Sequence, residues 1–221
     1  MIQDIWPKHL DNQYKNLKPG KGDTVFYFQG SSLLARPSGH FNSQNPEENV
    51  LIYPQYDEFV QGIKSSYGDK AVDNFEFIYL LSIDEEHFFL ARKTGSLERG
   101  TFLGEMADSA VHKDMYSFVR GYEFIGVDSF RKAQPREHAY AAITAFHLYG
   151  WYRDNHFCGR CGKPLKHDDK QRMLRCYCCK NMVFPKICPA VIVAVTDKDR
   201  ILLTKYAGRT YRNYALIAGF T

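Results

Sequence analysis

The chain has 221 residues, of which 44% are hydrophobic and 24% charged, and this balance predicts a folded globular protein and excludes intrinsic disorder as its main state. No run reaches the roughly 18 consecutive apolar residues that a membrane span needs. The first residues also lack the charged-then-apolar order of a signal peptide. We therefore expect a cytoplasmic protein with no membrane partner.

The formal charge of +4 is unevenly distributed along the chain. Residues 1–150 carry 15 Lys and Arg against 20 Asp and Glu, which gives −5, whereas residues 151–221 carry 14 against 5, which gives +9. This difference indicates two modules. The basic half favours an anionic partner, either a nucleic acid or a phosphate-bearing small molecule, although a solvated basic face has the same composition.

The first 130 residues are rich in short apolar or alternating runs typical of β-strands. Five segments show this pattern: 24–28, 32–35, 75–83, 86–92 and 122–127. The segment 75–83 is followed after only two residues by 86–92, which predicts a hairpin. Weaker helical spacing is present at 56–66 and 105–119.

From residue 134 the apolar period becomes that of an α-helix, and we predict a helix over about 135–153. We interpret its apolar face as core packing: Ala139, Ala142, Ile143, Phe146 and Tyr149. After the cysteines, the sequence predicts an apolar strand over 189–195, a charged turn, and a hairpin partner at 201–205. A third apolar run covers 214–218.

All six cysteines fall between residues 158 and 188, which favours metal binding over a disulfide framework. Four of them have the C-x2-C-x14-C-x2-C spacing of two thiolate turns around zinc: Cys158, Cys161, Cys176 and Cys179. Four thiolates complete the coordination of zinc and leave no position for water, so we predict a structural zinc. The spacing favours Cys179 over Cys178 as a ligand, and Cys188 is expected to be a buried free thiol.

The cysteine pairs and the segments after them resemble the NADH pyrophosphatases of the Nudix hydrolase superfamily. The matching residues are Phe157–Gly162, Cys176 and Cys179, then Phe184-Pro185-x-x-x-Pro189, and then the apolar runs 191–195, 201–203 and 216–220. The resemblance is specific over about residues 150–221. Residues 1–150 fit the N-terminal domain of that family only loosely.

The resemblance implies an α+β chain with a β-rich N-terminal domain, a linking helix, a zinc ribbon and the first strands of a Nudix α/β/α sandwich. The implied boundaries are 1–133, 134–155, 156–186 and 187–221, in that order. Members of the family are generally homodimers, and they hydrolyse NADH or NAD to nicotinamide mononucleotide and AMP with Mg²⁺ or Mn²⁺. Some members also remove NAD caps from RNA.

The resemblance also implies roles for single residues. The four spaced cysteines are the implied zinc ligands, the backbone carbonyl of Ala218 is an implied Mg²⁺ ligand, and Phe220 is implied to stack on a ring of the dinucleotide. Phe184 takes the place of a substrate-contacting tyrosine, and Gln171 takes that of a substrate-contacting glutamate. Both therefore depart from the family pattern in their polar groups.

The catalytic glutamates of the family belong to the Nudix box, which would begin a few residues after Phe220. This sequence has no glutamate after Glu137, so it holds none of those catalytic residues. We therefore interpret the chain as the front part of such a hydrolase, cut before the Nudix box. The 221-residue chain alone is expected to be inactive toward NADH.

A zinc-ribbon binding module without catalysis is the alternative interpretation. It would bind RNA or another protein through the basic residues around the cysteines: Arg160, Lys163, Lys166, Lys170, Arg172 and Arg175. RNA binding of this kind weakens steeply with salt, with a log–log slope of roughly −0.7 per contacted phosphate of a single strand. Recognition of a dinucleotide by stacking and a pyrophosphate clamp changes less with salt.

Overall fold

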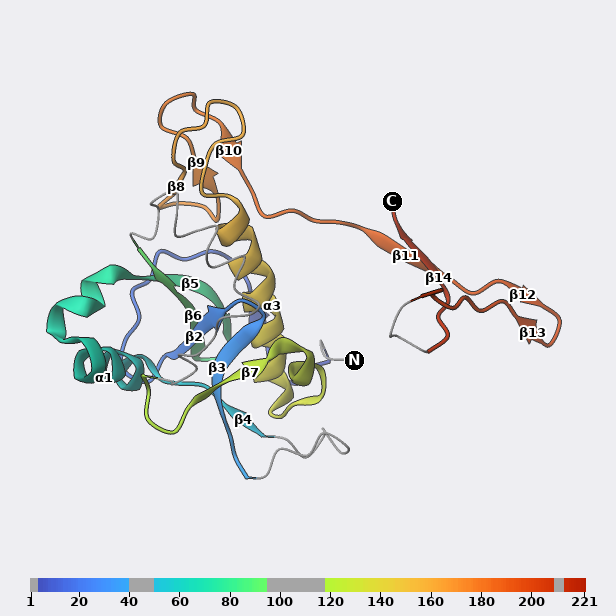
Figure 1. Ribbon diagram of the computed structural model, residues 1–221, viewed down its shortest axis with the longest axis horizontal. Coiled ribbons are helices and arrows are strands. Elements are labelled where there is room, and N and C mark those ends of the chain that lie inside the picture. Colours follow the sequence, from blue (N-terminus) through green and yellow to red (C-terminus); the bar gives the residue numbers. More distant parts are fainter. Residues whose placement is uncertain (1–3, 40–49, 95–117, 209–212) are drawn as a thin grey trace. The chain divides into compact units, whose positions relative to one another are not determined.

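A computed structural model describes residues 4–39, 50–94, 118–208 and 213–221 (Figure 1). The chain divides into two compact units, Met1–Phe184 and Pro185–Thr221. Within the described ranges, the first contains a large β-sheet, the helices α1 and α3 and the cysteine pairs, and the second contains two small sheets. Every helix within the described ranges is too short or too polar to span a lipid bilayer.

The large sheet has the strand order β1-β5-β6-β2-β3-β4 in the described part of the chain, and β7 also pairs with β3. Its strands are β1 (Leu10–Asp11), β2 (Thr24–Gln29), β3 (Ser32–Pro37), β4 (Leu51–Ile52), β5 (Phe75–Ile83), β6 (Glu86–Lys93) and β7 (Glu123–Gly126). β2 and β6 pair in parallel, and the other strand pairs described for this sheet are antiparallel. Two-residue loops join β2 to β3 and β5 to β6, and Gly30 (φ 55°) and Asp84 (φ 52°) supply the left-handed conformation that such loops require.

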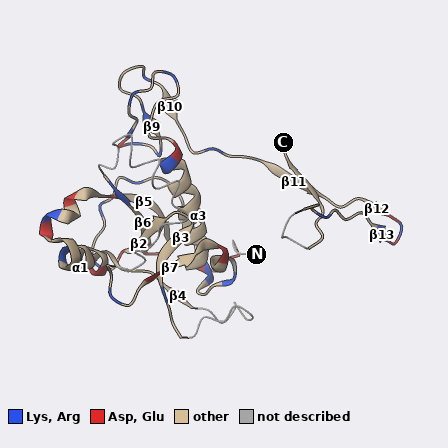
Figure 2. Ribbon diagram, in the orientation of Figure 1, with Lys and Arg blue, Asp and Glu red and all other residues tan. Residues whose placement is uncertain are grey.

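Two α-helices, α1 (Tyr56–Tyr67) and α3 (Arg136–Asp154), cover opposite faces of this sheet (Figure 1). Along β2, Phe26 and Phe28 pack in one core with α3, whereas Val25 and Tyr27 pack in the other core with α1. This division follows from the two-residue period of a strand. Charged residues are found on α1, at the ends of α3 and in loops (Figure 2).

The close approach of α3 to the sheet depends on small side chains. Four alanines of this helix are buried: Ala139, Ala141, Ala142 and Ala145. At its C-terminal end the helix buries two large rings, Trp151 and Tyr152. Two 3-10 helices, Asp69–Asn74 and Val127–Lys132, precede β5 and α3 in the chain.

The predicted α+β class, the β-rich N-terminal half and the linking helix are confirmed. Each of the five predicted strands of this half is present, and 75–83 and 86–92 form the β5–β6 hairpin. The helices expected at 56–66 and 135–153 are α1 and α3. The helix expected at 105–119 lies outside the described residues, apart from its last two, which are not helical.

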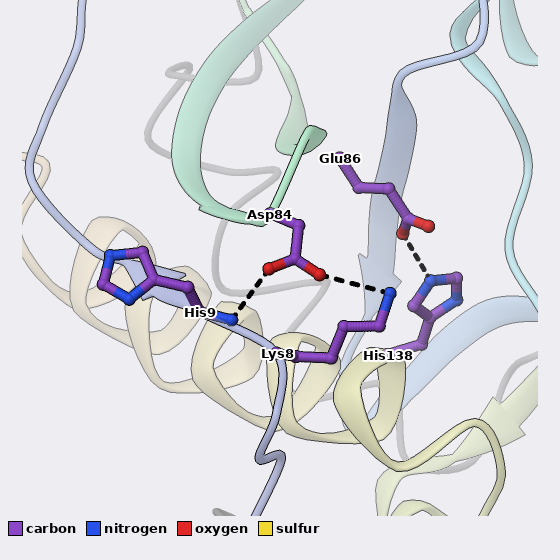
Figure 3. A network of polar contacts seen from close by, with 5 residues as sticks. All are labelled: Lys8, His9, Asp84, Glu86 and His138. Atoms are coloured by element: carbon purple, nitrogen blue, oxygen red, sulfur yellow. Dashed lines mark hydrogen bonds and ion pairs between the residues drawn. The ribbon is translucent and has the colours of Figure 1, made fainter.

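Asp84 fixes the N-terminal segment to the β5–β6 turn (Figure 3). Its carboxylate accepts a hydrogen bond from the His9 backbone amide at 2.8 Å and lies 3.3 Å from Lys8 Nζ. The Asp84 amide donates to the His9 carbonyl at 2.9 Å. Beside this group, His138 Nε2 of α3 lies 2.6 Å from Glu86 Oε2 at the start of β6. The N-terminal segment, the hairpin and α3 are thus linked at one place.

We expect Asp84→Asn to loosen the N-terminal segment. The hydrogen bond from the His9 amide and the ion pair with Lys8 lower the pKa of Asp84, so folding favours its ionised form. This stabilisation is present above the ordinary aspartate pKa and is lost as the pH falls through the lowered pKa. Asparagine tolerates the left-handed conformation of the turn, so the variant removes the charge without new backbone strain.

Hydrogen exchange of the His9 amide provides the measurement. At neutral pH, exchange should be faster in Asp84→Asn than in the wild type, and the two proteins should converge below the pKa of Asp84. Glu85→Gln, which removes a charge from the same exposed turn, is the matched control. Equal exchange in Asp84→Asn and the wild type at neutral pH would contradict the prediction.

The second unit contains two antiparallel pairs of short strands. β11 (Ala190–Val193) pairs with β14 (Ile217–Phe220), and β12 (Thr196–Asp197) pairs with β13 (Arg200–Ile201). The predicted charged turn is present, but the prediction that 189–195 pairs with 201–205 is wrong for most of its length. The hairpin contains only the residues next to the turn, where Arg200 pairs with Asp197 at 2.7 Å, and β11 takes β14 as its partner. Cys188, expected to be buried, is exposed.

This second unit exposes many apolar side chains, and we expect it to promote self-association. They are Val191, Ile192, Val193, Ile201, Leu202, Leu203, Ile217 and Phe220. Two-stranded sheets cannot bury both of their faces, and their unpaired edges can add further strands. Light scattering should therefore show a mass that rises with concentration. Ile192→Lys, at a side chain 71% exposed, should reduce this rise, whereas Thr196→Lys adds the same charge to the hairpin and should reduce it less. A monomer at high concentration would contradict the prediction.

Candidate metal centre

Two turns of similar geometry present the four spaced cysteines. In the first, the Gly162 amide donates to the Cys158 carbonyl at 2.8 Å, and Gly162 has φ 69°. In the second, the Lys180 amide donates to the Cys176 carbonyl at 2.9 Å, and Lys180 has φ 60°. The fourth residue after the leading cysteine is thus left-handed in both turns. The glycine at the first position favours this geometry, and the lysine at the second gives no such signal in the sequence.

A small antiparallel sheet connects the two turns. Its order is β10-β9-β8, with β8 at Lys166–His167, β9 at Leu174–Arg175 and β10 at Met182–Val183. Leu174 is 3% exposed and belongs to the same core as α3. Residues 156–184, which we call the ribbon, are therefore packed against the large sheet and α3 through a shared core.

The sulfur atoms of the four cysteines converge on one point. All four lie within 4.8 Å of one another. Cys158 Sγ lies 3.5 Å from Cys179 Sγ, and Cys161 Sγ lies 3.4 Å from Cys176 Sγ, which is too far for a disulfide. A zinc–sulfur distance of about 2.3 Å sets tetrahedral sulfurs about 3.8 Å apart, so these cysteines fit one structural zinc ion.

The environment of Cys158 favours its thiolate. Burial raises the pKa of this cysteine, but hydrogen bonds from the backbone amides of Arg160 and Cys161, together with those from the thiols of Cys179 and Cys161, outweigh burial and lower the pKa to about 6. The Arg160 amide lies 3.4 Å from Cys158 Sγ, and the Asn181 side-chain amide lies 3.6 Å from it. Such N–H groups orient a metal-bound thiolate and stabilise its charge. Cys178 is exposed and lies outside the cluster, as the spacing indicates.

Arg172 provides a contact between the ribbon and the large sheet that the sequence analysis missed. Its guanidinium donates a hydrogen bond to the Leu80 carbonyl of β5 and lies 5.9 Å from the centre of the Tyr14 ring. Arg175 lies 3.4 Å from Asp168 and is half-buried. The alternative interpretation included both arginines among the basic residues that bind RNA. In the structure both instead make contacts within the protein. No local pattern in the sequence indicates these contacts of Arg172, because its partners Leu80 and Tyr14 are far away in the sequence.

The other residues singled out in the sequence lie in exposed positions. Gln171 is in the turn between β8 and β9, and its backbone amide donates to Asp168 Oδ1 at 3.1 Å. Phe184 is 49% exposed at the end of the first unit. In the second unit, Ala218 is opposite Ile192 in the β11–β14 pair, and Phe220 is 84% exposed. Their roles in substrate or Mg²⁺ binding stay predictions.

Comparison with known proteins gives partial similarity. No family model matches the chain. It is 36% identical over 70 residues to the NAD-capped RNA hydrolase NudC of Pseudomonas aeruginosa (strain LESB58), which covers 32% of this chain and 25% of that protein. The NudC proteins of Pseudomonas putida (strain W619) and Salmonella typhi are 37% identical over 70 residues and 33% identical over 73 residues. These two matches cover 32% and 33% of this chain, and 25% and 28% of the relatives. The chain thus spans about a quarter of the length of the curated relatives that it matches. Over about a third of its own length, it is similar to NAD-capped RNA hydrolases.

Proposed function

We propose that this chain is the front part of a Mg²⁺-dependent Nudix hydrolase. The enzyme cleaves the pyrophosphate of NADH or NAD to nicotinamide mononucleotide and AMP, and it also removes NAD caps from RNA. One observation carries the proposal: a chain with a four-cysteine centre is partly similar to proteins named NAD-capped RNA hydrolases. The contrast between an acidic first half and a basic second half agrees with a substrate that carries phosphates.

In this proposal the four cysteines hold a structural zinc that stabilises the ribbon and does no chemistry. The proposed domains are residues 1–133, the linking helix 134–155, the ribbon within 156–186 and the start of a Nudix domain at 187–221. The active species is a homodimer. The exposed apolar side chains of the second unit support association with further protein surface.

The proposed substrate contacts come from three residues, and a fourth supplies a Mg²⁺ ligand. Phe220 stacks on a ring of the dinucleotide, and its 84% exposed side chain is free to do so. Phe184 supplies a second aromatic surface, and Gln171 supplies an amide in place of a carboxylate. The carbonyl of Ala218 is one Mg²⁺ ligand; Mn²⁺ has the same ligand preferences and is able to replace Mg²⁺.

Residues 185–221 do not fit a complete Mg²⁺ centre. Their only carboxylates are Asp197 and Asp199, both in the β12–β13 turn, and Asp197 is paired with Arg200 at 2.7 Å. Mg²⁺ in phosphoryl-transfer enzymes takes carboxylate ligands beside the substrate phosphates. We therefore derive no hydrolytic step from these residues.

Hydrolysis by the natural gene product tests the proposal. The coding DNA is read past codon 221, and the intact mass of the natural protein is measured. That protein is incubated with NADH, NAD or NAD-capped RNA and Mg²⁺, and the products are separated. We expect AMP and nicotinamide mononucleotide from the dinucleotides and loss of the cap from the RNA, all abolished by EDTA.

The 221-residue polypeptide is the matched sample in the same assay. We expect it to form no AMP, because it lacks the catalytic glutamates. Failure of the natural protein to hydrolyse all three substrates would refute the proposed function. Mg²⁺-dependent AMP formation by the 221-residue polypeptide would show that residues within this chain carry the chemistry, against our assignment.

RNA binding by the ribbon without catalysis is the second candidate. Four of the six basic residues in the alternative interpretation have exposed side chains: Arg160, Lys163, Lys166 and Lys170. Lys166 Nζ also lies 5.9 Å from the centre of the Tyr177 ring, which is 56% exposed. Exposed aromatic rings beside basic side chains bind single-stranded nucleic acid. Affinity for an uncapped RNA that falls steeply with salt, without hydrolysis of any NAD substrate, would favour this candidate.

A further inference from the structure

A polar cavity of about 380 Å³ lies where the ribbon meets the large sheet. Three parts of the first unit line it: the N-terminal segment, the strands β5 and β6, and the ribbon. The polar side chains of its lining include Tyr14, Glu76, Arg92, Lys166, His167 and Asp169. The volume is within the roughly 300–1,000 Å³ of small-molecule sites. None of the residues singled out in the sequence for zinc, Mg²⁺ or the dinucleotide lines this cavity.

The cavity lining carries two cations, and one of them, Arg92, is held in place. The Arg92 guanidinium lies 5.0 Å from the centre of the Tyr152 ring, and its Nη2 donates to Glu76 Oε2 at 3.0 Å. This ion pair uses one of the five N–H groups of the guanidinium and offsets the charge of Glu76. Lys166 contributes an exposed ammonium group. Arg172, packed against the Tyr14 ring, adds a third positive charge beside the cavity.

Buried polar atoms without partners surround the same place. In the described part of the chain, Tyr152 Oη, His167 Nε2 and Arg172 Nε are buried without a hydrogen bond. They belong to one group of contacts, because the His167 ring lies 5.1 Å from the Tyr14 ring and 5.6 Å from the Tyr152 ring. The Tyr152 side chain is only 1% exposed. Buried polar atoms are nearly always satisfied, so a polar ligand or ordered water belongs here.

The protonation states of Tyr152, His167 and Arg172 indicate which kind of hydrogen-bond partner they lack. Burial raises the pKa of Tyr152 and lowers the pKa of His167, so near neutral pH the first is a neutral hydroxyl and the second a neutral imidazole. The hydroxyl and the Arg172 N–H both donate. In the cavity lining, Arg92 and Lys166 balance the carboxylates of Glu76 and Asp169, and Arg172 adds a positive charge beside the lining. A hydrogen-bond acceptor would satisfy the unpaired donors, and a negative charge on it would offset Arg172.

We propose that this cavity binds the phosphate group of a small molecule. The phosphate oxygens accept hydrogen bonds from Arg92 and Lys166 at the cavity wall. Ordered water connects the phosphate to the unpaired donors Tyr152 Oη and Arg172 Nε. Arginine suits this role, because the planar guanidinium matches the geometry of phosphate oxygens. The size of the cavity admits inorganic phosphate or a mononucleotide, which share this chemistry.

Calorimetric titration of the zinc-loaded chain tests the proposal with three probes: inorganic phosphate, AMP and adenosine. We expect phosphate and AMP to bind and adenosine not to bind. AMP affinity at least tenfold above that of phosphate identifies a mononucleotide site, and equal affinities identify a site for phosphate alone. Because this measures binding to the 221-residue chain, its result does not depend on whether the natural protein hydrolyses NAD.

Substitutions locate the binding. Lys166→Gln and Arg92→Gln should each weaken phosphate binding by about tenfold or more, which corresponds to about 1.4 kcal/mol. Lys170→Gln removes an exposed charge from the nearby turn that does not line the cavity, and binding should change less than about twofold, since an exposed charge is largely screened. Lys166 is exposed, so its substitution leaves the fold intact, and thermal melting checks Arg92→Gln for folding.

Three results would overturn the proposal. The first is absence of binding of both phosphate and AMP to folded, zinc-loaded chain. The second is equal binding of AMP and adenosine, because the phosphate would then contribute nothing. The third is an effect of Lys170→Gln as large as that of Lys166→Gln, because binding would then depend on overall charge and not on this cavity.

Discussion

Replacement of Cys176 by serine is expected to release zinc and unfold the ribbon. Cys176 is fully buried, its sulfur lies 3.4 Å from Cys161 Sγ, and its backbone amide donates to the Asn181 carbonyl at 2.9 Å. The ribbon has only three strands of two residues each, so most of its stability must come from the metal. Structural zinc contributes on the order of 10–16 kcal/mol of apparent binding free energy in small zinc domains.

Metal analysis of purified protein and hydrogen exchange of the ribbon amides are the measurements. The wild type should contain one zinc per chain, and Cys176→Ser should contain almost none and lose protection throughout 156–184. Cys178→Ser is a close control, because it makes the same chemical change two residues away at an exposed sulfur outside the cluster. It should keep its zinc. Equal zinc loss in both variants, or full zinc in Cys176→Ser, would contradict the predicted ligand set.

Replacement of Leu174 by alanine is expected to destabilise the whole first unit, and not the ribbon alone. Leu174 is 3% exposed, and it belongs to the same core as Phe28 of the sheet and Trp151 of α3. A buried leucine truncated to alanine costs about 2–5 kcal/mol, because apolar contact is lost and a cavity remains. Since the core is shared, the cost should affect the unfolding of sheet, helix and ribbon together.

Urea unfolding followed by two probes measures this effect. The far-ultraviolet circular dichroism reports the sheet and α3, and the zinc content of each sample shows whether the metal is retained. Leu202→Ala makes the same change at a side chain 52% exposed in the second unit, where the effect should be within about 0.5 kcal/mol. If Leu174→Ala leaves the unfolding of the sheet unchanged and alters only ribbon amides, the shared core is not a cooperative unit.

Much of the fold was predictable from local patterns. The β5–β6 hairpin follows from two apolar runs separated by two residues, and α3 follows from a change of the apolar period after residue 134. The cysteine cluster follows from spacing alone, because a C-x2-C turn places both sulfurs on one side of the backbone. In each case the residues that interact are close in the sequence, so the pattern contains the contact.

The prediction for the second unit failed where the partners are far apart. An apolar run such as 189–195 forms a strand with any suitable edge, and its sequence does not specify which one. Proximity favoured the next apolar run, but the partner of β11 is β14, more than twenty residues away. The same run was expected to follow a buried Cys188, which is exposed.

The sequence by itself determined the strand-rich first half, the linking helix and the four cysteines of the metal centre, because periodicity and short-range spacing encode them. Only the tertiary structure decided that Arg172 lies half-buried beside Tyr14 and that Arg92, Lys166 and His167 line one polar cavity. Each of these contacts joins segments that are distant in the chain. Whether a charged side chain is solvated or enclosed depends on which surface folds over it, and residue type and spacing do not record that surface.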